Sequence, residues 1–160
     1  MIHIRTAGPI DAAPMADLLN AIIGAGGTTA MTDPVTAAML KDWMQAKPGT
    51  AWHLAEDDTG TVLGFQWIEP KVGLPPEACD IATFVRTGQA KLGIGSALFD
   101  HTRTAAKSLG YGWINATIRA DNTGGLAYYQ SRGFETYTTR KNVPLPGGAT
   151  VDRISKRFDL

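Results

Sequence analysis

The first half of the chain alternates between helix-like and strand-like spacing of its hydrophobic positions. Residues 12–23 place their large apolar side chains at the spacing of one helical face, at Met15, Leu18, Leu19 and Ile22. This pattern predicts a helix that Asp11 caps and Gly24 ends. A second helix is predicted to begin at Asp33-Pro34, because a capping residue followed by proline is typical of a first turn, and to end at Pro48-Gly49.

Strand-like segments occupy most of the remaining chain. They are predicted over residues 1–6, 51–56, 62–69, 79–85, 113–118, 134–140 and 153–159. Two more helices are predicted between them, one over residues 94–109 and one from the capping residue Asn122 to Gly133. The order β-α-α-β-β-β-α-β-α-β-β, without repeat or linker, predicts an α/β (α+β) fold. We expect a mixed sheet with helices on both faces, in a single domain of residues 1–160.

Composition narrows the functional classes. Of 160 residues 44% are hydrophobic, which is enough for a core, and 15 Lys and Arg balance 15 Asp and Glu. A net charge of zero argues against nucleic acid or a membrane as the main partner, because both favour a basic excess. The one cysteine, Cys79, excludes an internal disulfide, and no signal peptide, long apolar span or metal-binding cluster is visible. We therefore expect a cytoplasmic protein without a metal ion.

A glycine-rich turn lies between the strand over residues 79–85 and the following helix. Its sequence is Leu92-Gly93-Ile94-Gly95-Ser96. The first N–H groups of a helix have no partner within it and attract an anion, so the turn predicts a phosphate-bearing ligand. A Walker A loop would need Lys-Ser or Lys-Thr after Gly95, and a dinucleotide fingerprint would need glycine at Leu98. Neither a nucleoside triphosphate nor NAD is therefore favoured.

The turn becomes specific in combination with two later segments. The three are Gly93–Leu98, the strand over 113–118, and the run Asn122–Phe134, NTGGLAYYQSRGF. In this order and spacing they resemble the GNAT acyltransferases, closely over residues 78–135 and loosely over the whole chain. The resemblance implies acetyl-CoA as co-substrate, an amine as acceptor, a homodimer, and a mostly antiparallel sheet of about seven strands with about four helices.

The resemblance also implies roles for the residues of the glycine turn. In the family this turn holds the CoA pyrophosphate, here through Lys91, Leu92, Gly93, Ile94, Gly95 and Ser96. The chain departs from the family at Ala90, where arginine or glutamine is usual, and this leaves the affinity and the acyl-chain preference open.

Further roles fall outside the turn. The main chain of the strand over 79–85 is expected to polarise the thioester carbonyl, through Thr83, Phe84 and Val85. Asn122 is expected to contact the cofactor arm, and Tyr129 to donate a proton to the departing thiolate.

A second resemblance concerns the acceptor. Thr28-Thr29 and Asp80 are similar to the branch that acts on phosphinothricin and related amino acids, where a carboxylate on this strand faces the substrate. It implies that Thr28 and Thr29 bind the acceptor and that Asp80 takes the amine proton, with Glu69 as the rival base. The expected acceptor is a small amine with a carboxylate, an amino acid or analogue. Two alternatives stay open: an acetyltransferase of protein N-termini and a non-catalytic acyl-CoA-binding sensor.

Overall fold

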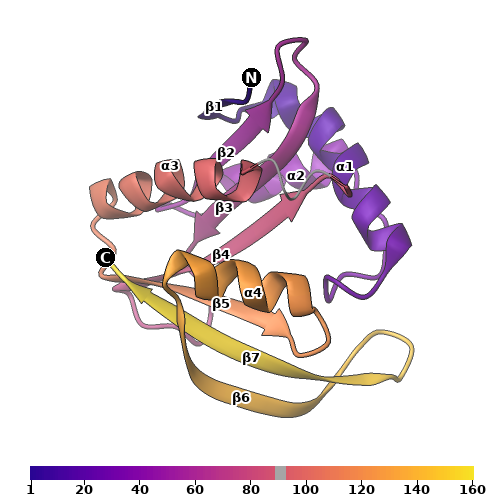
Figure 1. Cartoon of the computed structure of the whole chain (residues 1–160), viewed down its shortest axis with the longest axis vertical. Coiled ribbons are helices and arrows are strands. Elements are labelled where there is room, and N and C mark those ends of the chain that lie inside the picture. Colours follow the sequence, from indigo (N-terminus) through magenta and orange to yellow (C-terminus); the bar gives the residue numbers. More distant parts are fainter. Residues whose placement is uncertain (89–92) are drawn as a thin grey trace.

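Every strand in the computed structural model, which describes residues 1–88 and 93–160, belongs to one sheet (Figure 1). The strands are β1 (His3–Thr6), β2 (Ala51–Glu56), β3 (Val62–Glu69), β4 (Ala78–Val85), β5 (Trp113–Arg119), β6 (Glu135–Pro144) and β7 (Thr150–Asp159). Their order is β1-β2-β3-β4-β5-β7-β6. Neighbouring strands are antiparallel except for β4 and β5, which are parallel. The predicted mixed, mostly antiparallel sheet is confirmed.

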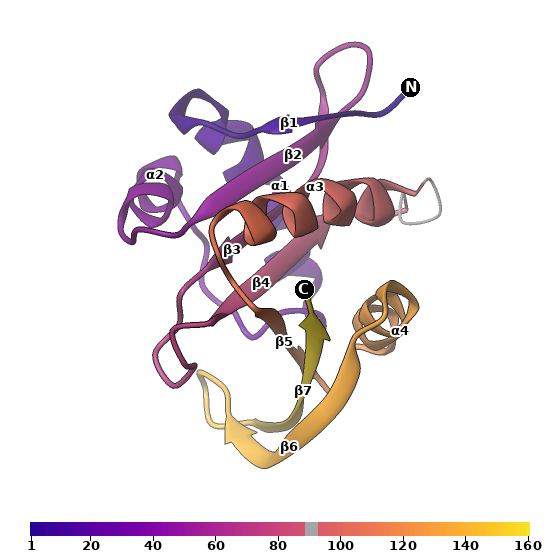
Figure 2. The same ribbon diagram turned by 90° about the vertical axis from the view of Figure 1, so that its left-hand side faces the viewer.

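The helices cover both faces of this sheet (Figure 2). They are α1 (Ala12–Ala25), which follows the short 3-10 turn η1 (Pro9–Asp11), then α2 (Ala37–Gln45), α3 (Ile94–Ser108) and α4 (Thr123–Arg132). One hydrophobic cluster joins α1 and α2 to one face of β2, β3 and β4. Two others join α3 and α4 to the opposite face, because successive side chains of a strand point to opposite sides.

Helix α2 begins later than the sequence indicates. Asp33-Pro34 does not open it; Thr36 does, by accepting a hydrogen bond from a backbone N–H of the first turn. The side chain of Asn20 bonds to both the N–H and the C=O of Val35. These two bonds hold the preceding segment against α1, so a local capping signal loses to a tertiary contact.

Strands β4 and β5 part after a short pairing. They are in register only from Ala78 opposite Trp113 to Asp80 opposite Asn115. Beyond Asp80, β4 continues beside β3 to Val85 without pairing to β5 in the described part of the chain. The sheet therefore has an opening in its middle, at the carboxyl ends of its two parallel strands.

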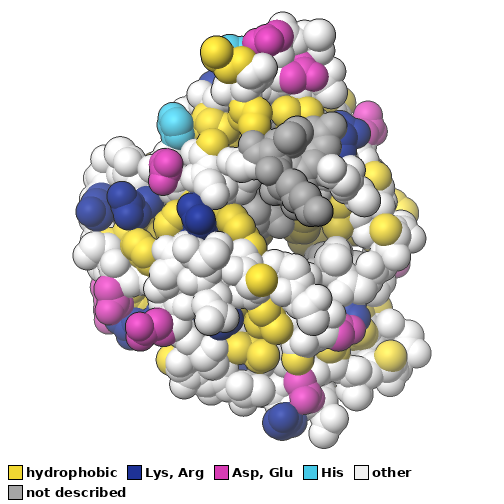
Figure 3. Space-filling view, viewed as in Figure 1, with side chains coloured by type: hydrophobic (Ala, Val, Ile, Leu, Met, Phe, Trp, Pro, Cys, Tyr) yellow, Lys and Arg dark blue, Asp and Glu magenta, His cyan; other side chains and the backbone are white. Residues whose placement is uncertain are grey.

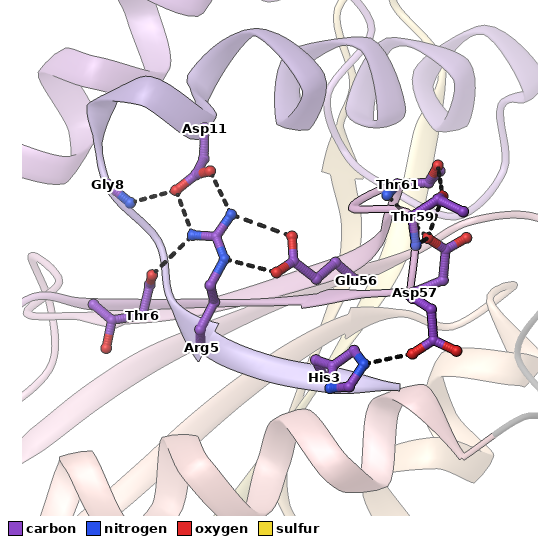
Figure 4. A network of polar contacts seen from close by, with 10 residues as sticks. His3, Arg5, Thr6, Gly8, Asp11, Glu56, Asp57, Thr59 and Thr61 are labelled. Carbon is purple, nitrogen blue, oxygen red and sulfur yellow. Dashed lines mark hydrogen bonds and ion pairs between the residues drawn. The ribbon is translucent and has the colours of Figure 1, made fainter. Parts of the chain in front are cut away.

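The role of Asp11 at the start of α1 differs from the predicted helix cap. Asp11 stands at the N-terminal position of α1, yet its side chain makes no capping hydrogen bond. Instead it accepts two hydrogen bonds from Arg5 of β1, at 2.7 and 3.0 Å, and one from the N–H of Gly8 (Figure 4). Arg5 also donates to Glu56 of β2. The cluster attaches α1 to the edge of the sheet.

We expect Asp11→Asn to lower the free energy of unfolding at pH 7 by about 1 kcal/mol, a screened value because the Arg5 side chain is 43% exposed. The hydrogen bonds from Arg5 hold the pKa of Asp11 below its ordinary value. The stabilisation is therefore complete above the unfolded-state pKa and is lost as pH falls through the lower folded-state pKa. Urea unfolding should show a smaller difference between wild type and variant at pH 3 than at pH 7. An equal difference at both pH values would contradict the assignment. The control is Asp17→Asn, which changes an exposed aspartate of the same helix α1.

Candidate active site

A cavity of about 430 Å³ lies at this opening, between the beginnings of α3 and α4 and the end of α1. In Figure 3 this face of the molecule is hollowed between the beginnings of α3 and α4. The cavity collects most of the residues predicted to bind the cofactor: Thr83, Phe84, Val85, Gly93, Gly95, Ser96, Asn122 and Tyr129. Ile94 is fully buried and packs in the core, so only its main chain is available to a ligand. Lys91 and Leu92 lie outside the described residues.

The two glycines of the turn serve different purposes. Gly93 precedes α3 with a φ of 76°, a left-handed conformation that side chains rarely adopt. A Cβ at Gly95 would lie 2.6 Å from the ring of Tyr128, and the Tyr128 hydroxyl donates to the Gly95 carbonyl at 2.7 Å. Gly95 is therefore required by the packing of α4 against α3, which the sequence pattern does not reveal.

A chain of hydrogen bonds leads from this contact to Tyr129. The side-chain amide of Gln66 on β3 donates to the Tyr128 hydroxyl at 3.1 Å and to the Thr83 hydroxyl at 2.8 Å. Thr83 in turn lies 2.8 Å from the Tyr129 hydroxyl. Gln66 is fully buried, and sequence reasoning missed it. The sequence feature that could have indicated Gln66 is that it is a single amide among the apolar residues of β3.

Burial changes the acidity of both tyrosines. It raises the pKa of Tyr128 to about 12 and raises that of Tyr129 further. Burial disfavours the charged phenolate in each case. Tyr129 therefore keeps its proton throughout the neutral range, as a general acid must.

A second cavity, of about 260 Å³, lies next to the first, on the face of the sheet to which Trp67 and Ala82 belong. It contains the other predicted site residues: Thr28, Thr29, Glu69 and Asp80. Thr83 and Tyr129 line this cavity as well as the first, so the two cavities adjoin at these side chains. A ligand in each could meet its neighbour beside the Tyr129 hydroxyl.

The two carboxylates of the second cavity are neighbours across β3 and β4. Glu69 and Asp80 are opposite each other in the register. Asp80 accepts a hydrogen bond from Asn115 at 2.8 Å and pairs with Lys71 at 3.3 Å. Glu69 lies 4.0 Å from the Lys47 ammonium. Asp80 is therefore held more firmly than Glu69.

The loop after α1 forms a wall of the second cavity, and its main chain is held in place. Arg119 donates to the carbonyl of Thr29, and the side-chain amide of Asn122 donates to the carbonyl of Thr28, both at 3.0 Å. Asn122 also caps α4 by accepting from Gly125 at 2.9 Å. Asn122 thus joins the loop to the first turn of α4 and lines both cavities.

Two absences apply to the described ranges 1–88 and 93–160. No three His, Cys, Asp or Glu side chains are grouped there so that they could hold a metal ion. In the same ranges no helix has the length and apolarity needed to cross a membrane.

A model of the acetyltransferase (GNAT) family matches residues 16–134, from α1 to the start of β6. The chain belongs to the GNAT acetyltransferase family. As a member it is an acetyl-CoA-dependent N-acetyltransferase, and the resemblance carried by the glycine turn and the Asn122–Phe134 run is confirmed. A comparison with curated protein sequences found no match.

Solved structures of other acetyltransferases share the fold of this GNAT enzyme. A ribosomal-protein-alanine N-acetyltransferase from Brucella melitensis is 22% identical, with a TM-score of 0.90 over 99% of each chain. A phosphinothricin acetyltransferase from Sinorhizobium meliloti, in complex with acetyl-CoA, is 18% identical, with a TM-score of 0.88 over 99% of this chain and 88% of that chain. A GCN5-related N-acetyltransferase from Kribbella flavida is 24% identical, with a TM-score of 0.84 over 99% and 98%. At these identities the likeness establishes the fold.

Proposed function

We propose that this enzyme transfers the acetyl group of acetyl-CoA to the primary amine of a small amino acid or analogue. The observation that carries the proposal is the meeting of two cavities at Thr83 and Tyr129. In the first cavity the N-terminus of α3 is available to bind a phosphate. In the second cavity the carboxylates Asp80 and Glu69 are available to take the proton of an amine. Each co-substrate then occupies its own cavity, and the two meet beside Tyr129.

The first cavity offers main-chain hydrogen-bond donors to acetyl-CoA. The N–H groups at the start of α3, from Gly93 to Ser96, are available for the pyrophosphate because a helix leaves its first N–H groups unpaired. The edge of β4 beyond Asp80 is not paired to β5, so main-chain amides over Thr83–Val85 are candidates to polarise the thioester carbonyl. The Sinorhizobium meliloti structure, with the same fold, contains acetyl-CoA.

The reaction needs one base and one acid. The amine nitrogen attacks the thioester carbon and loses a proton to Asp80, directly or through water, while the carbon–sulfur bond breaks. The departing thiolate takes the proton of Tyr129, and the products are the N-acetylated acceptor and CoA. The proton on Asp80 then returns to the Tyr129 phenolate through solvent, which restores the enzyme. The Tyr129 hydroxyl lies beside Thr83 where the two cavities adjoin, and burial keeps it protonated until the thiolate departs.

We expect Asp80→Asn to lower kcat/KM for the acceptor by about 100-fold, a typical contribution of a general base. Without the base only an already neutral amine reacts, so the residual rate should rise with pH up to the amine pKa. Glu69→Gln is the matched variant on the neighbouring strand and should lose less than about tenfold. Steady-state kinetics against pH checks both variants. A larger loss for Glu69→Gln would assign the base to Glu69 instead.

The second cavity favours a small acceptor. Its volume of about 260 Å³ is modest, and the loop over Thr28–Met31 and Trp67 bound it. Transfer to protein N-termini stays the alternative, since the Brucella melitensis neighbour is named for such a substrate. A non-catalytic sensor is disfavoured because Tyr129 and two candidate bases line the second cavity.

A panel of acceptors tests the proposal. CoA release is followed with acetyl-CoA and the standard L-amino acids, polyamines, and peptides with a free N-terminus. The proposal expects at least one amino acid to have the highest kcat/KM. Peptides or polyamines that exceed every amino acid by tenfold or more would overturn the acceptor class, and no acceptor-dependent release from any amine would overturn the transfer.

Assembly and location in the cell stay predictions. The edge strand β6 is exposed along almost its whole length, and an exposed edge can pair with a second copy. We expect light scattering at tens of micromolar protein to give twice the 17.1 kDa of the chain. A mass near 17.1 kDa would reject the homodimer. The cytoplasmic location predicted from the sequence needs a separate measurement in cells.

A further inference from the structure

The second cavity contains one cation that no group of the described residues neutralises. Its charged side chains are Glu69, Lys71, Asp80, Arg119 and Arg153. Lys71 forms an ion pair with Asp80, and Glu69 forms one with Lys47. Arg119 donates two hydrogen bonds to Asp121. The side chain of Arg153 makes neither a hydrogen bond nor an ion pair with any described residue.

The guanidinium of Arg153 is partly removed from water. The side chain is half-buried, and its Nε–H is buried without an acceptor. A buried donor without a partner is costly, and the cost disappears when a ligand oxygen accepts from the same group. Arginine presents its N–H donors in a planar fork that matches a carboxylate in a two-bond contact.

Arg153 is the middle one of three arginines on neighbouring strands. In the register Arg153 on β7 lies between Arg119 on β5 and Arg140 on β6. Like charges side by side on neighbouring strands destabilise a sheet, so the row attracts anions. Asp121 neutralises Arg119, and Arg140 is exposed to water. Arg153, the central arginine, lines the second cavity and is therefore available to bind an anionic ligand.

We infer that Arg153 binds the α-carboxylate of the acceptor, so that the substrate is a free amino acid rather than the N-terminus of a peptide. The inference rests on the proposed function. Asp80 is opposite Asn115 and Arg153 is opposite Arg119, which places them four residues apart along β5. This is about 13 Å along the strand direction, and because β4 and β7 flank β5 on opposite sides the two backbone positions are about 16 Å apart. The two side chains and an amino acid between them can fill that span. The amine then points to Asp80 and the carboxylate to Arg153.

The experiment compares an amino acid with its own primary amide. The probes are the best amino acid of the acceptor panel and the amide made from it, which keeps the amine and side chain but lacks the negative charge. Wild type should prefer the acid by about tenfold or more in kcat/KM, the range expected for a charge-assisted contact. Arg153→Gln should raise KM for the acid by at least about tenfold and bring the ratio of acid to amide near one. Its kcat and its KM for acetyl-CoA should change less than about twofold.

Two further variants make the test specific. Arg153→Lys keeps the positive charge without the planar guanidinium and should restore part of the preference for the acid over the amide. If Arg153→Gln does not fold, the lysine variant provides the test. Arg140→Gln removes an exposed arginine from the same row and should leave the ratio of acid to amide unchanged. An unchanged ratio in folded Arg153→Gln, with normal acetyl-CoA binding, would overturn the inference and leave the proposed function standing. A wild type that acetylates no amine would overturn the proposed function, and this inference with it.

Discussion

Tyr129→Phe is expected to lower kcat by about 10²- to 10⁴-fold, the usual contribution of a general acid, while the Kd for acetyl-CoA changes little. The substitution keeps the aromatic ring, which packs against Phe134, and removes only the hydroxyl beside Thr83. Without that proton the thiolate must leave as an anion in a site with little water. Initial rates with saturating acceptor, together with calorimetry of acetyl-CoA binding, separate the loss of chemistry from a loss of binding.

Tyr128→Phe is the matched control for this prediction. It removes a hydroxyl from the adjacent residue of the same helix, where that hydroxyl donates to Gly95 and accepts from Gln66. We expect a stability loss of about 1 kcal/mol, the worth of a typical hydrogen bond, and less than about a tenfold change in kcat. If the two phenylalanine variants lose the same modest activity, Tyr129 has only a packing role.

Gly93→Asp is expected to weaken acetyl-CoA binding by about 100-fold or more, which corresponds to about 2.7 kcal/mol. Gly93 stands immediately before α3, where the pyrophosphate is proposed to lie. An aspartate there adds a negative charge against the phosphates and a side chain at the turn. Calorimetry with CoA measures the loss directly and does not depend on the identity of the acceptor.

Two controls separate charge from backbone strain. Gly93→Asn has the same shape without the charge, and asparagine tolerates a positive φ comparatively well, so it should retain more CoA affinity than the aspartate variant. Gly60→Asp places the same residue at a similar φ, 84° against 76°, in the turn between β2 and β3. It should cost stability without changing CoA affinity. Wild-type affinity in folded Gly93→Asp would show that the phosphate binds elsewhere.

Periodicity located the elements well where packing and local preference agree. Helix α1 and strands β2 and β3 match the predicted segments closely, because their apolar positions face the core that they build. The prediction was wrong where a long-range contact competes with a local signal. Asn20 holds Val35 and delays α2, and Arg5 takes the carboxylate of Asp11 away from the cap of α1.

Strands β6 and β7 also extend further than their sequences indicate. The prediction ended the first at residue 140 and began the second at residue 153, whereas they run to Pro144 and from Thr150. Their added residues pair with each other, as Val143 does with Val151. Strand β6 is exposed at nearly every position and shows little alternation of apolar side chains, so its pairing with β7 rather than its pattern determines the length of both.

The sequence by itself determined the order of helices and strands, the glycine turn before α3 and the Asn122–Phe134 run, because each depends on residues close together in the chain. The tertiary structure alone decided which side chains meet. Gln66, Thr83 and Tyr129 come from β3, β4 and α4, and their hydrogen bonds join residues up to 46 positions apart in the case of Thr83 and Tyr129. Periodicity assigns a side chain to a face of a strand but not to a neighbour. Two features therefore follow from the assembled sheet alone. One is the separation of β4 from β5, which lets both cavities reach Tyr129, and the other is the lack of a described partner for the Arg153 side chain.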